Sequence, residues 1–229
     1  AINGFGRIGR QQVKAVHERY WDAIEIAAIG ITDSHLTENR ALLLKHDSVY
    51  GTFGADVEAV VKGRVNAIRV DGRQIDIVGR NLYGPVPEWR RWGIDLVVEA
   101  TGYFKDGPAA SKHRTAGAER VLITAPAKGV DVTMVLGVNE SDFDPATHRI
   151  MSNASCTTNC LAPAAKVIAD TYGIRQGLLS TIHAYTGARG SAAGTTPVSG
   201  ASTRVSGSLE TSWNAHHAPS RSNPCTGDQ

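Results

Sequence analysis

The sequence predicts an α/β chain built on a doubly wound parallel sheet. Two short apolar stretches, Asp95–Glu99 and Val121–Thr124, are typical of parallel strands that helices cover on both faces. The helical pattern Ala109–Ala116 lies between them and supplies the crossover that parallel strands require. A glycine-rich turn and a further predicted helix, Gln11–Tyr20, open the chain in the same strand, turn and helix order.

Three glycines near the start of the chain have the G-x-G-x-x-G spacing of dinucleotide-binding turns: Gly4, Gly6 and Gly9. Gly4 permits a tight turn, Gly6 lets the backbone approach a pyrophosphate, and Gly9 allows close packing of helix on strand. The phosphates would rest on N–H groups at the helix N-terminus. The motif therefore predicts a Rossmann-type sheet that binds NAD or NADP, with an ordinary glycine-rich turn as the alternative.

The remaining elements are expected to complete this sheet and to add a hairpin at its side. Asp71-Gly72 stands between two apolar runs, which is a strong signal for a tight hairpin turn. Such a hairpin needs no chemistry of its own. We further expect a helix at Leu36–Lys45 and strands at Ile24–Ile29, Val57–Val61, Ala67–Val78 (interrupted by that turn), Thr133–Val138 and Arg149–Met151.

Four residues after predicted strands are candidates for further cofactor contacts. Asp33 is the acidic residue nearest the position that holds the adenosine ribose in such folds, although it comes a few residues late. It could equally cap a helix or a loop, so NAD and NADP both remain open. Thr101, Gly102 and Thr124 follow predicted strands, where open parallel sheets bind ligands, and a role in the turn alone is the alternative.

Cys156 lies where the predicted strand Arg149–Met151 gives way to a helical pattern. A thiol at a helix N-terminus meets unpaired N–H groups and the positive end of the helix dipole. These lower the pKa of the thiol and favour the thiolate, which is the form that attacks a carbonyl carbon. The other interpretation is a small buried core residue.

His183 stands near the end of a further predicted strand, Gly177–Thr186. A histidine in such a place is commonly structural, but beside a thiolate it could activate the sulfur and move protons. Cys156, Cys160 and His183 match no common zinc spacing, so we expect no metal site.

The composition is that of an ordinary globular protein. The 229 residues include 24 basic and 22 acidic side chains, and the net charge of +2 gives no reason to expect nucleic acid as a partner. We find neither an apolar run that could span a membrane nor a leader pattern. Three cysteines, an odd number, form no disulfide framework, which favours a cytoplasmic location.

Five segments, in order along the chain, closely resemble phosphorylating glyceraldehyde-3-phosphate dehydrogenases: Ile2–Arg10, Glu99–Gly102, Ile123–Lys128, Ser152–Pro163 and His183–Thr186. The resemblance covers about residues 1–187. It implies NAD(P)-dependent oxidation of glyceraldehyde 3-phosphate, with inorganic phosphate as second substrate and 1,3-bisphosphoglycerate as product. Erythrose-4-phosphate dehydrogenase shares most of these motifs and is the near alternative. A nucleotide-binding chain without turnover is the alternative from another class.

The resemblance also implies roles for individual residues. Cys156 is the implied nucleophile, and His183 is its activating partner and proton shuttle. The positions implied to bind substrate or inorganic phosphate are Ser155, Thr157 and Thr186. Those implied to contact the cofactor, beyond the glycines, include Arg7, Ile8, Arg80 and Thr124.

Three regions are expected along the chain: a NAD(P)-binding domain at residues 1–151, the start of an α+β catalytic domain at 152–187, and a divergent tail at 188–229. The tail is rich in Ser, Thr, Gly, Ala and Pro and shows no apolar periodicity, so it cannot bury enough surface to offset its ordering entropy. Its composition favours a truncated or frame-shifted reading over a native disordered tail, and the first strand, which lacks a starting Met, is expected to be clipped. The family usually forms homotetramers, but with an incomplete catalytic domain we expect no stable tetramer.

Overall fold

The computed structural model describes residues 1–31, 37–63, 65–79, 85–183 and 203–206. The chain forms two compact units, Ala1–Asp170 and Thr171–Gln229, and each is described by itself. The first unit contains the nine-stranded sheet and the helices, of which the last, which begins at Cys156, belongs to this unit as far as Asp170.

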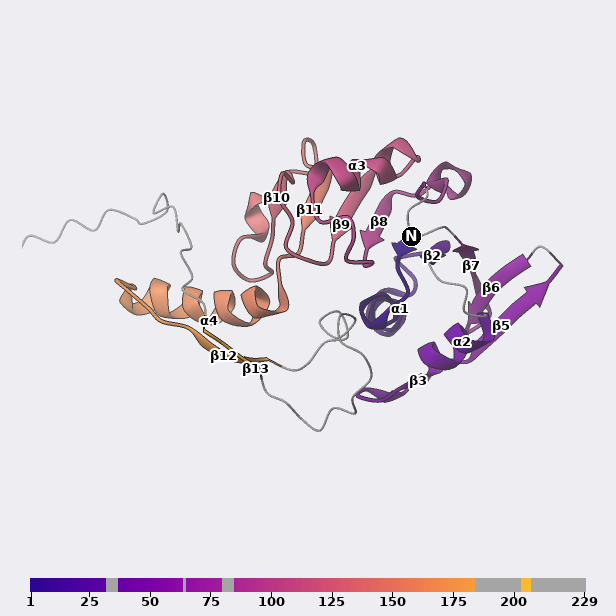
Figure 1. Ribbon diagram of the computed structural model, residues 1–229, viewed down its shortest axis with the longest axis horizontal. Coiled ribbons are helices and arrows are strands. Elements are labelled where there is room, and N and C mark those ends of the chain that lie inside the picture. Colours follow the sequence, from indigo (N-terminus) through magenta and orange to yellow (C-terminus); the bar gives the residue numbers. More distant parts are fainter. Residues whose placement is uncertain (32–36, 64, 80–84, 184–202, 207–229) are drawn as a thin grey trace, which may run out of the picture. The chain divides into compact units, whose positions relative to one another are not determined.

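The first unit is organised around a nine-stranded sheet in the order β10-β11-β9-β8-β1-β2-β7-β6-β5 (Figure 1). Every neighbouring pair from β10 to β7 is parallel, whereas β6 and β5 add on in antiparallel fashion at one side. The mostly parallel sheet confirms the predicted α/β fold class. The strands are β1 (Ile2–Asn3), β2 (Ala28–Ile31), β5 (Val57–Lys62), β6 (Val65–Val70), β7 (Arg73–Gly79), β8 (Leu96–Glu99), β9 (Arg120–Ile123), β10 (Val132–Thr133) and β11 (Ile150–Ser152).

Helices cover both faces of this sheet, because successive side chains of a buried strand point to opposite sides. Ile29 of β2 packs in one apolar core with Val13 of α1, whereas the adjacent Ala28 packs in another with Val97 and Ala116. The helices lie in chain order between strands: α1 (Arg7–Tyr20), α2 (Thr37–Lys45), the short 3₁₀ helix η1 (Trp89–Trp92), α3 (Gly107–Thr115), the 3₁₀ helix η2 (Glu140–Asp142) and α4 (Cys156–Tyr172).

The predicted hairpin is confirmed at Asp71-Gly72. The strands β6 and β7 pair antiparallel with Val70 opposite Arg73, which leaves a two-residue loop. Asp71 and Gly72 have φ values of 44° and 81°, as a type I′ turn requires. A second, short hairpin joins β3 (His46–Asp47) to β4 (Gly51–Thr52) and was not predicted.

Two predicted strands of the first unit differ from the structure, and the strand predicted at Gly177–Thr186 in the second unit begins only at Ser180. Ile24 does not begin a strand, because the backbone of Ala23 and Ile24 turns back onto the carbonyl oxygen of Tyr20, and β2 starts only at Ala28. The run predicted at Thr133–Val138 is also wrong beyond its first residue. The chain turns at Gly137, whose φ is 79°, and Val138 donates a hydrogen bond to Val135.

In the second unit, β12 (Ser180–His183) pairs antiparallel with β13 (Thr203–Ser206). The strand β13 falls inside the region that we expected to lack regular structure. Its sequence, Thr-Arg-Val-Ser, contains two β-branched residues, which favour an extended backbone although the stretch is too short to show a period.

The carboxyl ends of the central strands lie in one row. Asn3 of β1 is in register with Glu99 of β8, Glu99 with Ile123 of β9, and Ile123 with Ser152 of β11. The strand order reverses between β1 and β8, since β2 continues on one side of β1 and β8 on the other. In open α/β sheets the crevice at such a switch point is where ligands bind.

Candidate active site

The glycine turn after β1 is shaped by its contact with the turn after β8. Gly4 has a φ of 104°, and a Cβ built on it would lie 2.8 Å from the carbonyl carbon of Ala100 and from the amide nitrogen of Thr101. A Cβ on Gly9 would lie 2.1 Å from the carbonyl oxygen of Gly4, so α1 can come this close only with glycine. A Cβ on Gly6 would meet no atom within 4 Å. The backbone of Gly6 therefore borders open space.

The N-terminus of α1 can attract an anion. Gly6 is the N-cap residue, no side chain caps the helix, and no acidic residue lies in its first turn. Arg7 and Ile8, the first two helical residues, are exposed, and Arg10 reaches back to donate a hydrogen bond to the carbonyl oxygen of Phe5 (3.1 Å). The N–H groups of an uncapped first turn and the positive end of the helix dipole favour a negatively charged group here.

Asp47 holds the side chain of Arg7 near this helix start. Its Oδ1 lies 3.4 Å from Nη1 of Arg7 and accepts hydrogen bonds from the backbone N–H groups of Val49 and Tyr50. These backbone donors, followed by the charge of Arg7, hold the pKa of the Asp47 carboxyl below its usual range. Asp47 is therefore an anion over the physiological range and keeps Arg7 beside the glycine turn.

Thr101, Gly102 and Thr124 follow the ends of β8 and β9 at the same edge of the sheet, and their contact with a cofactor stays a prediction. The backbone N–H of Thr101 donates to Oε1 of Glu99 (2.7 Å), and Thr101 Oγ1 accepts from the N–H of Tyr103 (3.2 Å). Gly102 follows with a φ of 75°. Both the N–H and the hydroxyl of Thr124 donate to the carbonyl oxygen of Glu99, each at 3.0 Å. Glu99 thus organises the turns after β8 and β9.

Sequence reasoning missed the buried polar network around Glu99. Glu99, Asn3 and His113 are each at most 1% exposed, as is Trp89. Asn3 Nδ2 and His113 Nε2 both bind Glu99 Oε2, at 2.6 and 2.9 Å, and the indole N–H of Trp89 donates to His113 Nδ1 at 2.9 Å. A charged residue closing an apolar strand was the available signal, but its partners come from distant segments.

Cys156 is the first residue of α4, as predicted from the change of pattern at this point. Ser155 caps the helix: its Oγ accepts a hydrogen bond from the N–H of Thr158 (2.9 Å), and its carbonyl oxygen accepts one from the N–H of Asn159 (2.9 Å). The Cys156 side chain is exposed, which favours a reactive thiol over the buried-core interpretation. Thr157 follows it in the first turn and is partly buried.

The turn before Cys156 is fixed by a buried serine. Ser152, which is fully buried, donates from Oγ to the carbonyl oxygen of Ala125 (2.8 Å) and accepts from the N–H of Ala154 (3.1 Å). Ala154 has a φ of 54°, a left-handed conformation that is uncommon for a residue with a side chain. The side-chain amide of Asn159 closes the turn by donating to the carbonyl oxygen of Asn153 (2.8 Å). The chain therefore leaves β11 in a defined direction, and this fixes where Cys156 begins α4.

For several predicted site residues, the structure gives no side-chain position relative to Cys156 and the glycine turn. Asp33, Arg80 and Thr186 lie outside the described residues. The backbone of His183 ends β12 in the second unit, and its side chain also lies outside what the structure describes. The pairing of Cys156 with His183 stays a prediction.

The part of the chain that the structure describes contains no group of three or more His, Cys, Asp or Glu side chains that could hold a metal ion. None of the helices in the same residues has the length and apolar character needed to cross a bilayer.

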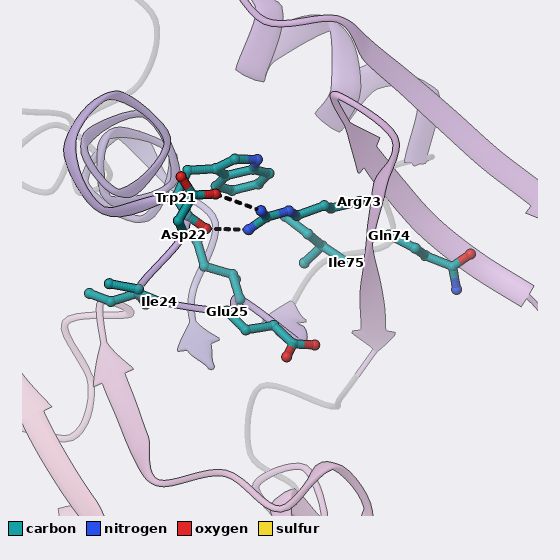
Figure 2. A pocket seen from close by; sticks show the side chains of 9 residues that line it. Trp21, Asp22, Ile24, Glu25, Arg73, Gln74 and Ile75 are labelled. Carbon is teal, nitrogen blue, oxygen red and sulfur yellow. Dashed lines mark hydrogen bonds and ion pairs between the residues drawn. The ribbon is translucent and has the colours of Figure 1, made fainter.

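A cavity of about 530 Å³ lies away from this site (Figure 2). Its walls come from the turn after α1, including Trp21 and Asp22, and from the first residues of β7. Arg73 closes one side, because its guanidinium lies 4.7 Å from the Trp21 ring centre and donates to Asp22 Oδ1 at 3.1 Å. These segments precede β2 and begin β7, so the cavity lies at the amino edge of the sheet, opposite the switch point.

The glycine turn, the switch point and the uncapped helix start define a dinucleotide-binding α/β chain with a cysteine at a helix terminus on the same sheet edge. Comparison with known families agrees. Residues 1–107 match the NAD-binding domain of glyceraldehyde 3-phosphate dehydrogenase, and residues 155–206 match its C-terminal domain. The chain belongs to the glyceraldehyde-3-phosphate dehydrogenase family. The second match continues past residue 187, where the resemblance seen in the sequence ends.

Known members are similar over most of this chain. It is 49% identical over 188 residues to the chloroplastic glyceraldehyde-3-phosphate dehydrogenase GAPB of Arabidopsis thaliana, a match that covers 82% of this chain and 41% of the relative. It is 46% identical over 185 residues to the glyceraldehyde-3-phosphate dehydrogenase of Streptomyces coelicolor, covering 81% and 53%. The chain therefore spans about half the length of these relatives.

Proposed function

We propose that the protein is an NAD(P)-dependent dehydrogenase that oxidises glyceraldehyde 3-phosphate and phosphorylates the product, with Cys156 as its nucleophile. One observation carries the proposal. Cys156 begins α4 just after β11, and Ser152 of β11 lies in the same register row as Asn3, which precedes the glycine turn. Three strand spacings separate the two, or roughly 14 Å. A dinucleotide bound at the switch point would therefore lie on the same edge as the thiol.

The residues at this edge fit a dinucleotide. Gly6 leaves room for close approach of a pyrophosphate, and the first turn of α1, with Arg7 and Ile8, offers N–H groups and positive charge. Thr101, Gly102 and Thr124 would border the part of the cofactor that crosses β8 and β9. A nicotinamide ring, when bound, supplies the hydride acceptor. We propose that the segment around Asp33 determines whether the protein prefers NAD or NADP.

Cys156 and its neighbours account for the remaining chemistry. The thiolate adds to the aldehyde carbon and forms a hemithioacetal on Cys156. That carbon then loses a hydride, and we assign to His183 the role of accepting the hydroxyl proton in the same step. The product on Cys156 is a thioester. Inorganic phosphate then attacks the thioester carbonyl, forms the acyl phosphate and returns the thiolate. Ser155, Thr157 and Thr186 are proposed to bind the anionic groups, together with N–H groups at the start of α4.

The test follows reduced cofactor by its ultraviolet absorbance after mixing the protein with glyceraldehyde 3-phosphate, inorganic phosphate and either NAD or NADP. We expect reduction that Cys156→Ser abolishes and that Cys160→Ser leaves unchanged. Cys160 is a matched control because its thiol is also exposed and lies one turn further along α4. Reduction that survives Cys156→Ser would contradict the nucleophile assignment.

Two other outcomes separate the alternatives. Faster reduction with erythrose 4-phosphate than with glyceraldehyde 3-phosphate would replace the proposed substrate while keeping the mechanism. Cofactor binding measured by calorimetry without any reduction would instead identify a nucleotide-binding chain without turnover and contradict the proposed activity.

A further inference from the structure

We propose that Glu99 is a positioning residue for the cofactor: a buried carboxylate that sets the shape of both turns at the switch point, held in place by His113 and Trp89. The inference rests on the proposed binding of a dinucleotide at this edge and assigns a role to residues that do not themselves border the crevice. It concerns cofactor affinity, not the chemistry at Cys156.

Four hydrogen bonds converge on the side chain of Glu99. Oε2 accepts from Asn3 Nδ2 at 2.6 Å and from His113 Nε2 at 2.9 Å. Oε1 accepts from the backbone N–H of Thr101 at 2.7 Å and from the hydroxyl of the same threonine. Four donors therefore point at one side chain that is 1% exposed. A carboxylate can accept all four, whereas a protonated acid would place its own hydrogen against one of the donors.

Trp89 fixes the tautomer of His113. An indole nitrogen is a donor only, so its 2.9 Å hydrogen bond to His113 Nδ1 requires that nitrogen to be unprotonated. The hydrogen of a neutral imidazole must then be on Nε2, where it is donated to Glu99. Trp89 and His113 are both fully buried, and Phe104 packs edge-on against the imidazole with ring centres 5.0 Å apart. The imidazole is therefore a rigid neutral donor to the carboxylate.

The carboxylate joins the two turns that form the switch point. Through Asn3 it holds the residue directly before the glycine turn, and through Thr101 it holds the turn after β8. The turns also touch one another, since a Cβ on Gly4 would lie 2.8 Å from the backbone of Ala100 and Thr101. A shift of either turn would displace the other. Ligand-contacting groups must be held to within a fraction of an ångström, and buried hydrogen bonds behind them provide this.

A purely structural role is the competing explanation. Buried ionised groups are costly unless fully hydrogen-bonded, so any damage to this network is expected to lower stability as well. Affinity and stability must therefore be measured separately, with a control that lowers stability from a neighbouring position. Val97 is suitable because it lies two residues before Glu99 in β8, is fully buried and packs in the apolar core beside Trp89.

The experiment compares wild type, Glu99→Gln and Val97→Ala by calorimetric titration with NAD, at a temperature where circular dichroism shows all three to be folded. Glutamine keeps the shape of Glu99 but turns an NH₂ group towards at least one of the four donors. We expect both variants to unfold at lower temperature. Glu99→Gln should raise the dissociation constant for NAD at least about tenfold, and Val97→Ala should leave it within about twofold of wild type.

Each possible result bears on either the inference or the proposed function. Equal NAD affinity in Glu99→Gln and wild type would overturn the inference while leaving the proposed function intact, and so would an equal loss of affinity in Val97→Ala. A wild-type chain that binds neither NAD nor NADP would remove the proposed function and the inference with it.

A second measurement needs no substitution, so it stays decisive even if Glu99→Gln does not fold. Nitrogen-15 NMR of the histidine side chains should show His113 as a neutral ring with hydrogen on Nε2 at pH 7. A protonated ring, or hydrogen on Nδ1, would overturn the proposed arrangement.

Discussion

Two glycines of the same turn are required for different physical reasons. Gly9 is a packing residue, because any Cβ there would overlap the carbonyl oxygen of Gly4 at 2.1 Å. Gly6 makes no such contact, and its φ of −71° is open to any residue. Its small size matters only if something else occupies the space beside it. Within one motif, Gly9 is therefore needed for folding, whereas Gly6 is expected to matter for cofactor binding.

A matched pair of alanine variants tests that separation. Gly9→Ala should lower the free energy of unfolding by about 1–3 kcal/mol, as overpacking of a close contact does. Gly6→Ala should cost at most about 1 kcal/mol, the scale of an N-cap change, yet weaken NAD binding clearly. Urea unfolding and calorimetric titration with NAD measure the two effects. Gly6→Ala that binds NAD like wild type would argue against a pyrophosphate at this position.

Among the residues, the sequence could predict those whose structural role depends only on their neighbours in the chain. The glycine spacing and the position of Cys156 could be read from neighbouring residues, because a turn and a helix start are short-range structures. The Glu99 network could not, since Asn3 and Glu99 are 96 positions apart. Such contacts arise only once β1 and β8 are known to be neighbours.

Among the elements, α4 begins at Cys156, the proposed nucleophile. Ser155 caps it through the N–H of Thr158, while Cys156 occupies the first helical position. The capping hydrogen bond and the electrostatic effect on the thiol can be varied independently, because Asp and Asn are both good N-cap residues but only Asp carries charge.

Ser155→Asp and Ser155→Asn should therefore keep the stability of wild type to within about 0.5 kcal/mol, whereas Ser155→Ala should lose about 1 kcal/mol. The aspartate is expected to slow alkylation of Cys156 by iodoacetamide near neutral pH, because a negative charge beside the sulfur disfavours the thiolate. The asparagine variant is the uncharged control. Equal alkylation rates in the Asp and Asn variants would show that charge near the helix start does not govern the thiol.

The pairing of β10 with β11 should depend on pH. Asp131 Oδ2 accepts hydrogen bonds from the N–H groups of Ile150 and Arg149, each at 2.7 Å, and these, Ile150 foremost, hold the pKa of the carboxyl below its ordinary value of 3.8. Because the pKa of Asp131 is lower in the folded than in the unfolded protein, its ionised carboxylate stabilises the folded state at pH values above the unfolded pKa. This stabilisation is lost as the pH falls through the folded pKa.

We expect Asp131→Asn to be less stable than wild type at pH 7, because the amide oxygen is an uncharged acceptor, and the difference to shrink below about pH 4. Urea unfolding at several pH values, from pH 7 down to well below about pH 4, measures it. Glu140→Gln, which removes an exposed carboxylate of η2, is the control and should change stability little throughout. A difference between Asp131→Asn and wild type that persists unchanged at low pH would contradict the ionised acceptor.

Element boundaries show where reading a sequence fails. The run at Thr133–Val138 is apolar enough for a strand, but Gly137 and the side chain of Asn139, which accepts from the N–H of Val135, turn the chain instead. The hairpin at Asp71-Gly72 was predictable because its two residues alone determine the turn. Boundaries that depend on a capping side chain or a distant partner are not written in the local pattern.

For the whole molecule, the arrangement that matters is the row of strand ends at one edge of the sheet. A mostly parallel sheet could be predicted from its apolar strands, but the order of the strands could not, because periodicity does not say which strands are neighbours. That order, which can be followed in Figure 1, brings the carboxyl ends of β1, β8, β9 and β11 to one edge of the sheet. These segments are far apart in the sequence, so their local patterns do not show that they lie at one edge.

Acyl-enzyme formation tests the central claim most directly. The protein is mixed with NAD and glyceraldehyde 3-phosphate without inorganic phosphate, quenched in acid and digested, and its peptides are weighed by mass spectrometry. We predict a 3-phosphoglyceroyl thioester on the peptide that contains Cys156, formed only when NAD is present and removed by added phosphate. An unmodified Cys156 peptide, or an acyl group on Cys160 instead, would contradict the account.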